Sequence, residues 1–72
     1  MHPIPAPGYT LADGENRPRP EWGDEVMVQI RLHGWCDMHG PWKVETTKWK
    51  WNRDEHGNVI KQDSDVVAIR KV

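Results

Sequence analysis

Apolar and polar residues alternate strictly along residues 25–32. The even positions from 26 to 32 hold Val, Val, Ile and Leu, and the odd positions from 27 to 31 hold Met, Gln and Arg. A period of two is typical of a strand with one face in a core and the other in solvent. We therefore predict a strand here, with the even-numbered side chains buried and the odd-numbered ones solvated.

The next part of the chain predicts a loop and a second strand. Glycine and proline interrupt residues 33–41, which favours a loop. Alternation returns over residues 42–52, where Trp49 and Trp51 share a face, but it shifts by one residue between Val44 and Thr47. Such a shift predicts a β-bulge or two short strands.

The last third of the chain predicts a hairpin and a final strand. Residues 53–58 have turn composition, with Gly57 free to take a positive φ, and residues 59–61 form a short return strand. Residues 65–72 are apolar on both faces, which is typical of a central strand, and Asp65 is expected to cap the preceding turn. No segment has the 3.6-residue period of a long helix.

Five of the six prolines lie within the first twenty residues. Proline favours extended backbone, so residues 1–21 predict an extended or disordered arm, with Tyr9 and Leu11 as its only large anchors. Residues 22–72 then form one small domain. The predicted fold class is all-β, a small antiparallel sheet or partly open barrel of three to five strands.

Length and charge narrow the classes of function. The 72 residues carry ten basic and eleven acidic side chains and a single cysteine. So short a chain has a marginal core, which favours self-association into a homo-oligomer. One cysteine forms no internal disulfide, and no apolar run approaches the roughly 18 residues of a membrane span. We expect a soluble cytoplasmic protein without a membrane partner.

One cluster has metal-ligand spacing. His33, Cys36 and His39 are separated by two residues each, and His56 could add a fourth zinc ligand from the hairpin. Structural zinc sites usually contain at least two cysteines, so the preferred interpretation is a polar loop beside a small thiol, with no metal and no cofactor.

The same cluster could form a Cys–His catalytic pair, and Asp63 with Asp65, or Asp54 with Glu55, could form carboxylate pairs. A small sheet has little room for a substrate cleft and an oxyanion hole, and acidic residues are ordinary in turns. We expect that the chain is not an enzyme.

Aromatic and basic residues interleave at Trp42, Lys43, residues 48–51 and Arg53. This pattern occurs in proteins that bind single-stranded nucleic acids. On a strand, however, the tryptophans would share one face and the lysines the other, which is simply a core face backed by a solvated face. The near-neutral charge favours that second interpretation.

Five tryptophans are more than this core needs, and tryptophan is common in binding hot spots. We predict that Trp35 and Trp42 are surface anchors for a partner. The alternative, that Trp22 and Trp35 close the ends of a small barrel, remains open.

Three elements carry a resemblance to a known group of proteins. They are Val26, Val28, Arg31 and Gly34; Trp49 and Trp51; and residues 65–72 at the end of the chain. Together they resemble short tailed-phage and prophage proteins that have a V-x-V-x-x-R-x-G strand, a W-x-W element and a terminus close to D-I-V-A-Y-R-V. Ile69 replaces the usual tyrosine, and residues 54–61 are an insertion.

The resemblance implies an accessory protein of the host cytoplasm. The leading prediction is a phage-encoded binding protein that modulates a host protein through Trp35, Trp42 and the loop of residues 33–39. One alternative is an oligomer that sequesters a nucleotide, with Arg31, Lys50 and Arg70 at its phosphate. The other is a single-stranded nucleic-acid binder.

Overall fold

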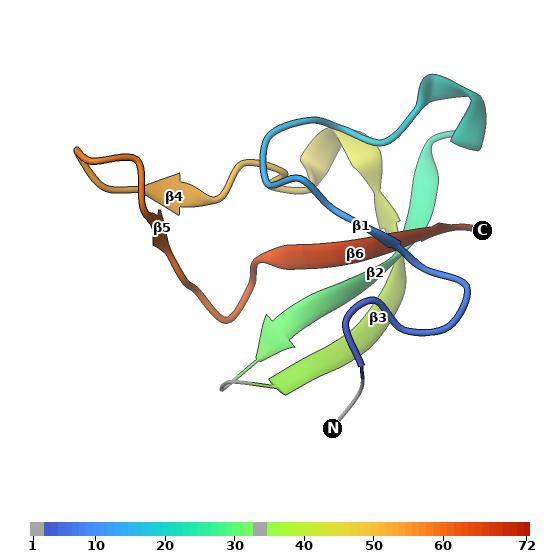
Figure 1. Cartoon of the computed structure of the whole chain (residues 1–72). Helices are drawn as coiled ribbons and strands as arrows, with labels where there is room; N and C mark the ends of the chain where they lie inside the picture. Colours follow the sequence, from blue (N-terminus) through green and yellow to red (C-terminus); the bar gives the residue numbers. More distant parts are fainter. Residues whose placement is uncertain (1–2, 33–34) are drawn as a thin grey trace.

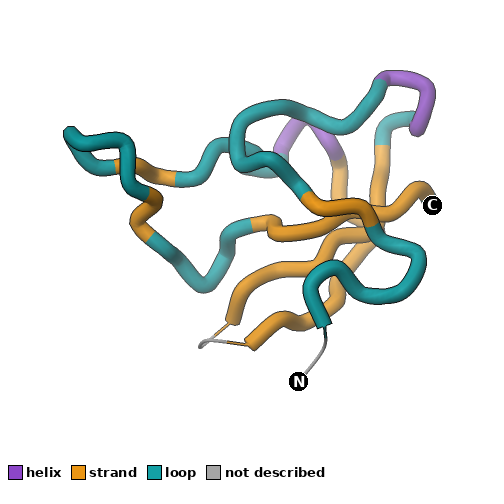
Figure 2. Tube along the Cα trace, in the orientation of Figure 1, coloured by secondary structure: helices purple, strands orange, loops and turns teal. Residues whose placement is uncertain are grey.

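A computed structural model describes residues 3–32 and 35–72, with the backbone alone for residues 35–37 (Figure 1). The described part of the chain contains no α-helix, and irregular segments flank the strands (Figure 2). In chain order its elements are β1 (Thr10–Leu11), the 3₁₀ helix η1 (Pro20–Trp22), β2 (Glu25–Leu32), β3 (Trp35–Lys43), the 3₁₀ helix η2 (Val44–Thr46), β4 (Asn52–Arg53), β5 (Val59–Ile60) and β6 (Val66–Lys71).

Four of these strands form one antiparallel sheet in the order β1-β6-β2-β3. The hairpin β4–β5 is separate and projects beyond one end of the sheet (Figure 1). The predicted small antiparallel sheet is confirmed, and it stays open rather than closing into a barrel. The final strand, β6, is an inner strand as expected, because β1 and β2 pair with its two edges.

The core lies on the face of β2 that the alternation predicts. Val26 and Val28 are fully buried and Ile30 nearly so, and they cluster with Val66 of β6 and with Trp49. Partly buried side chains pack around this cluster. They are Ile69 of β6, and Ala12, Trp22, Trp42 and Val44 from elsewhere in the chain. The predicted buried face of β2 is therefore confirmed.

The opposite face of β2 is not solvated as predicted. Gln29 is completely buried, because the proline-rich arm covers it. The backbone N–H of Ala6, itself buried, donates to Gln29 Oε1 at 3.0 Å, and Gln29 Nε2 donates to the carbonyl oxygen of Pro3 at 2.7 Å. Farther along the arm, β1 pairs with β6. A side-chain amide thus supplies the donor and the acceptor that a neighbouring strand would otherwise supply.

The predicted loop over residues 33–41 and strand over residues 42–52 are wrong for most of their length. Within the described residues, β3 already begins at Trp35, pairs with β2 and ends at Lys43. Gly40 and Pro41 are accommodated because β3 is the terminal strand of the sheet, where a missing backbone donor is tolerated. The β2–β3 irregularity lies between Val26 and Val28, not between residues 44 and 47.

Trp49 and Trp51 consequently lie on irregular backbone rather than on a strand face. Each indole N–H donates to a backbone carbonyl, Trp49 to Val44 at 2.9 Å and Trp51 to Val66 at 2.9 Å. The backbone N–H of Trp51 also donates to Gly14, whose absent Cβ leaves room for the Trp51 ring. These bonds hold residues 47–51 against the sheet without strand pairing.

The turn predicted over residues 53–58 is confirmed. The Asp54 carboxylate accepts the backbone N–H groups of His56 at 2.8 Å and Asn58 at 2.9 Å, and Gly57 has a positive φ of 84°. These hydrogen bonds stabilise the ionised Asp54 carboxylate and hold its pKa below the usual value of 3.8. The bond from the Asn58 backbone N–H makes the largest contribution.

Replacement of Gln29 should release the arm. In Gln29→Leu, Ala6 N–H loses its acceptor in a buried position, so we expect a loss of about 1–3 kcal/mol in the free energy of unfolding. Urea denaturation measures the loss, and limited proteolysis should cleave the arm faster than in the wild type. Gln62→Leu, at an exposed glutamine, is the matched control. An uncleaved arm in Gln29→Leu would contradict this role.

The turn should depend on pH through Asp54. A carboxyl whose pKa is lowered on folding stabilises the fold above its unfolded pKa, and this contribution is lost as pH falls through the folded pKa. We expect the amide proton shifts of His56 and Asn58 to titrate together, with a midpoint below 3.8, in an NMR pH series. Asp54→Asn should abolish that titration; its persistence would exclude Asp54 as the titrating group.

Candidate functional site

Arg31, a predicted phosphate ligand, is engaged inside the protein. Its Nη1 lies 3.8 Å from Asp65 Oδ2, and its guanidinium carbon lies 5.6 Å from the centre of the Trp51 ring. The Asp65 side chain is 2% exposed and that of Arg31 19%. Asp65 also accepts the Gln62 backbone N–H at 3.0 Å, as expected of a residue that caps the turn. The Arg31 charge is therefore largely balanced internally.

The other two predicted phosphate ligands have different surroundings. The Arg70 guanidinium lies over the Tyr9 ring, 5.8 Å from its centre, which ties the arm to β6. Lys50 is exposed on the segment that precedes β4. Arg31 and Arg70 are thus each held against a different aromatic side chain, and their role as phosphate ligands stays a prediction.

The predicted zinc ligands are not gathered within the described residues. His33 and the side chains of Trp35 and Cys36 lie outside the described residues, so their roles stay predictions. His39 is exposed on β3. His56 lies at the tip of the projecting hairpin, with its Nε2 atom 3.5 Å from Glu55 Oε1. The described side chains hold no group of three or more His, Cys, Asp or Glu that could bind a metal.

Trp42, a predicted anchor, lies at the end of β3. Its side chain is half-buried and packs against the core, and its ring centre is 5.9 Å from that of His39 at an interplanar angle of 33°. One part of the indole therefore supports the fold while another part remains open to a partner. Of the two predicted anchors, Trp42 is the one whose side chain is described.

Trp42 also lines a shallow groove of about 360 Å³, which we call the β3 groove. Its walls come from the end of β3 and from the segment that follows η2. The lining residues are Pro41, Trp42, Lys43, Thr46, Thr47, Lys48 and Ser64. Two lysines and no carboxylate line it, so all of its charged lining residues are basic.

Local hydrogen bonds shape the wall of this groove. Thr47 Oγ1 donates to the carbonyl oxygen of Lys43 at 2.6 Å, and Thr46 Oγ1 contacts the same oxygen at 3.4 Å. These bonds hold the backbone turn just after β3. Sequence patterning missed Thr46 and Thr47, because threonine in a region predicted to be a strand gives no signal of a cavity. It also missed Ser64, because serine is ordinary in the turn expected just before the final strand.

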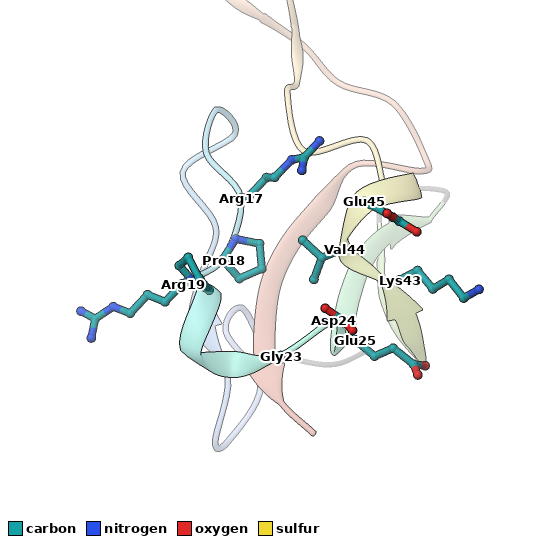
Figure 3. Close-up of a pocket in the computed structure, with 10 residues that line it drawn as sticks. Arg17, Pro18, Arg19, Gly23, Asp24, Glu25, Lys43, Val44 and Glu45 are labelled. Atoms are coloured by element: carbon teal, nitrogen blue, oxygen red, sulfur yellow. The ribbon is translucent and has the colours of Figure 1, made fainter.

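A cavity of about 600 Å³ lies between residues 17–20 and the junction of β3 with η2 (Figure 3). Pro18 lines one side of it and Val44 the other, while the Arg19 and Lys43 side chains extend away from each other. Its charged lining residues are three basic and three acidic: Arg17, Arg19, Lys43, Asp24, Glu25 and Glu45. The mixed charges give this cavity no preference for ligands of one sign.

Comparison with known proteins assigns no family. No protein-family model, characterised protein sequence or solved structure matches the chain. No helix in the described ranges is long and apolar enough to cross a membrane. Among the described residues, the β3 groove joins the predicted anchor Trp42 to two lysines without a carboxylate.

The pairing of Arg31 with Asp65 predicts a strong dependence of stability on both residues. In Asp65→Asn, the Arg31 guanidinium loses its counter-charge in a mostly buried position, so the free energy of unfolding should fall by about 2–3 kcal/mol. Arg31→Met is the second single variant. The double variant Arg31→Met/Asp65→Asn should lose less free energy of unfolding than Asp65→Asn and Arg31→Met lose together. Denaturant titrations measure this coupling, with Glu21→Gln as the exposed control. Additive losses would show that the pair is not coupled.

Proposed function

We propose that this chain is a binding protein that holds an extended, acidic segment of a partner protein along β3. The observation that carries the proposal is the β3 groove, where a half-buried tryptophan lies between lysines and no carboxylate is present. The partner segment would pair with the outer edge of β3 and place a side chain against Trp42.

The position of β3 supports this mode of binding. It is the terminal strand of the sheet, and within the described chain only β2 pairs with it. Terminal strands accept a further strand through backbone hydrogen bonds, while pockets beside them select its side chains. Nine residues give β3 the length for such pairing, whereas β1, the opposite terminal strand, has two.

The charge of the groove supports an acidic segment in particular. Lys43 is exposed and makes no side-chain hydrogen bond or ion pair within the described residues, and Lys48 makes one long contact of 3.4 Å with Gln62. Both ammonium groups are thus available to carboxylates of a partner. Complementary charges of this kind raise association rates and select against basic partners.

The two alternative functions are less well supported. Nucleotide binding at Arg31 and Arg70 would compete with their contacts to Asp65, Trp51 and Tyr9. Nucleic-acid binding through Trp49 and Trp51 would need ring faces that the core and Arg31 already occupy. The resemblance to phage proteins favours a host protein as the partner and the host cytoplasm as the setting, with the chain acting as a modulator.

A peptide-display selection tests this proposal. Random linear peptides of about twelve residues are selected on the intact chain, and backbone amide shifts are then recorded for the peptides that bind. We expect selected peptides to be rich in Asp and Glu and to perturb residues 38–43 and 46–48. The double variant Lys43→Glu/Lys48→Glu should weaken their binding by about tenfold or more.

The matched control is Lys61→Glu/Lys71→Glu, which makes the same change of charge at exposed lysines that do not line the groove. It should bind the selected peptides within about twofold of the wild type at physiological ionic strength, where distant charges are screened. Peptides without acidic residues, or shifts that map to another surface, would overturn the proposal. Equal losses in the two double variants would also overturn it.

A further inference from the structure

Residues 17–20, Arg-Pro-Arg-Pro, form a strap that stands off from the core. Arg17, Pro18 and Arg19 line both the cavity of about 600 Å³ described above and a second cavity of about 400 Å³. Proline fixes φ and favours extended backbone, so the strap does not fold down onto the residues beneath it. We call the second space the strap cavity.

The floor of the strap cavity is apolar and aromatic. Trp22, Trp49 and Ile69 line it together with Leu11 and Ala12 of the arm. The Trp49 indole N–H already donates to Val44, so this ring offers its surface for packing rather than a donor. The Trp22 indole N–H has no hydrogen-bond partner among the described residues and remains a donor for a ligand.

The rim of the strap cavity is basic. Arg17 and Arg19 are exposed, and within the described ranges neither guanidinium forms an ion pair or a hydrogen bond. Asp13, the one carboxylate among the lining residues, already accepts the backbone N–H groups of Glu15 and Asn16, each at 2.8 Å, and the Asn16 side-chain amide at 2.9 Å. The lining of the strap cavity therefore carries two basic groups and one carboxylate, and that carboxylate is already bonded within its own turn.

From these features we infer that the strap cavity binds a small planar aromatic anion. Its ring would pack on the tryptophan floor, and its carboxylate or phosphate would pair with Arg17 and Arg19. A cavity of about 400 Å³ lies in the size range of small-molecule sites. Arginine pairs with planar carboxylates and with phosphates through two parallel hydrogen bonds, which suits both kinds of anion. The inference is independent of the β3 groove, whose lining residues are all different.

The larger of the two cavities does not offer the same chemistry. Asp24, Glu25 and Glu45 line it, and they would repel an anion held by the same arginines. No tryptophan lines that cavity. Of these two spaces, only the strap cavity combines an aromatic floor with more basic than acidic lining residues.

NMR titration of the intact chain tests this inference with two probes, adenosine monophosphate and indole-3-acetate. Adenosine and indole are the uncharged controls. We expect at least one of the two anions to shift the indole N–H signals of Trp22 and Trp49, and the matching uncharged compound to bind about tenfold more weakly or not at all.

Charge-removing variants locate the site. Arg17→Gln/Arg19→Gln changes two exposed side chains that make no contact on which folding depends, and it should weaken binding of the anion about tenfold. Lys61→Gln/Lys71→Gln is the matched control, and Lys43→Glu/Lys48→Glu should also leave this binding unchanged. The inference is overturned if neither anion shifts Trp22 and Trp49, if the uncharged compounds bind equally well, or if Arg17→Gln/Arg19→Gln binds as the wild type does.

Discussion

The architecture depends on one buried amide. Gln29 lies in the middle of β2, fully buried, with its carboxamide bonded to the backbone of Pro3 and Ala6. A buried amide without partners would cost free energy of the same order as the whole stability of so small a domain. The arm therefore has to lie across this face of the sheet, and its position in turn aligns β1 with the edge of β6.

The same constraint explains how residues 3–32 and 35–72 enclose the inner strands of the sheet without an α-helix among them. The arm covers one face of β2, and residues 44–51 cover the other through the buried Trp49 ring. In irregular segments of this kind, side chains make hydrogen bonds with backbone groups. The indole N–H groups of Trp49 and Trp51, which donate to backbone carbonyl oxygens, are examples. Such segments also leave spaces beside the sheet that regular elements would have filled.

Both sites proposed for this chain are such spaces. The β3 groove forms where the chain turns away from the terminal strand through η2, and the strap cavity forms where prolines keep residues 17–20 away from Trp49. Each combines an indole surface with two basic side chains. The excess of tryptophan over phenylalanine in the composition thus serves two purposes, because the indole fills the core with one part and meets the surface with another.

Local patterning in the sequence was enough to determine β2, the inner strand β6 and the turn after β4, because alternation, turn residues and Asp54 act over a few residues. The prediction that Trp42 reaches the surface agrees with its half-buried position at the end of β3. The tertiary structure alone decided that β3 extends through Gly40 and Pro41, that Gln29 is buried, and that Arg31 pairs with Asp65. Each of these features depends on a partner far away in the sequence. The local alternation of apolar and polar residues does not indicate which strand edge, carbonyl group or charge that partner will be.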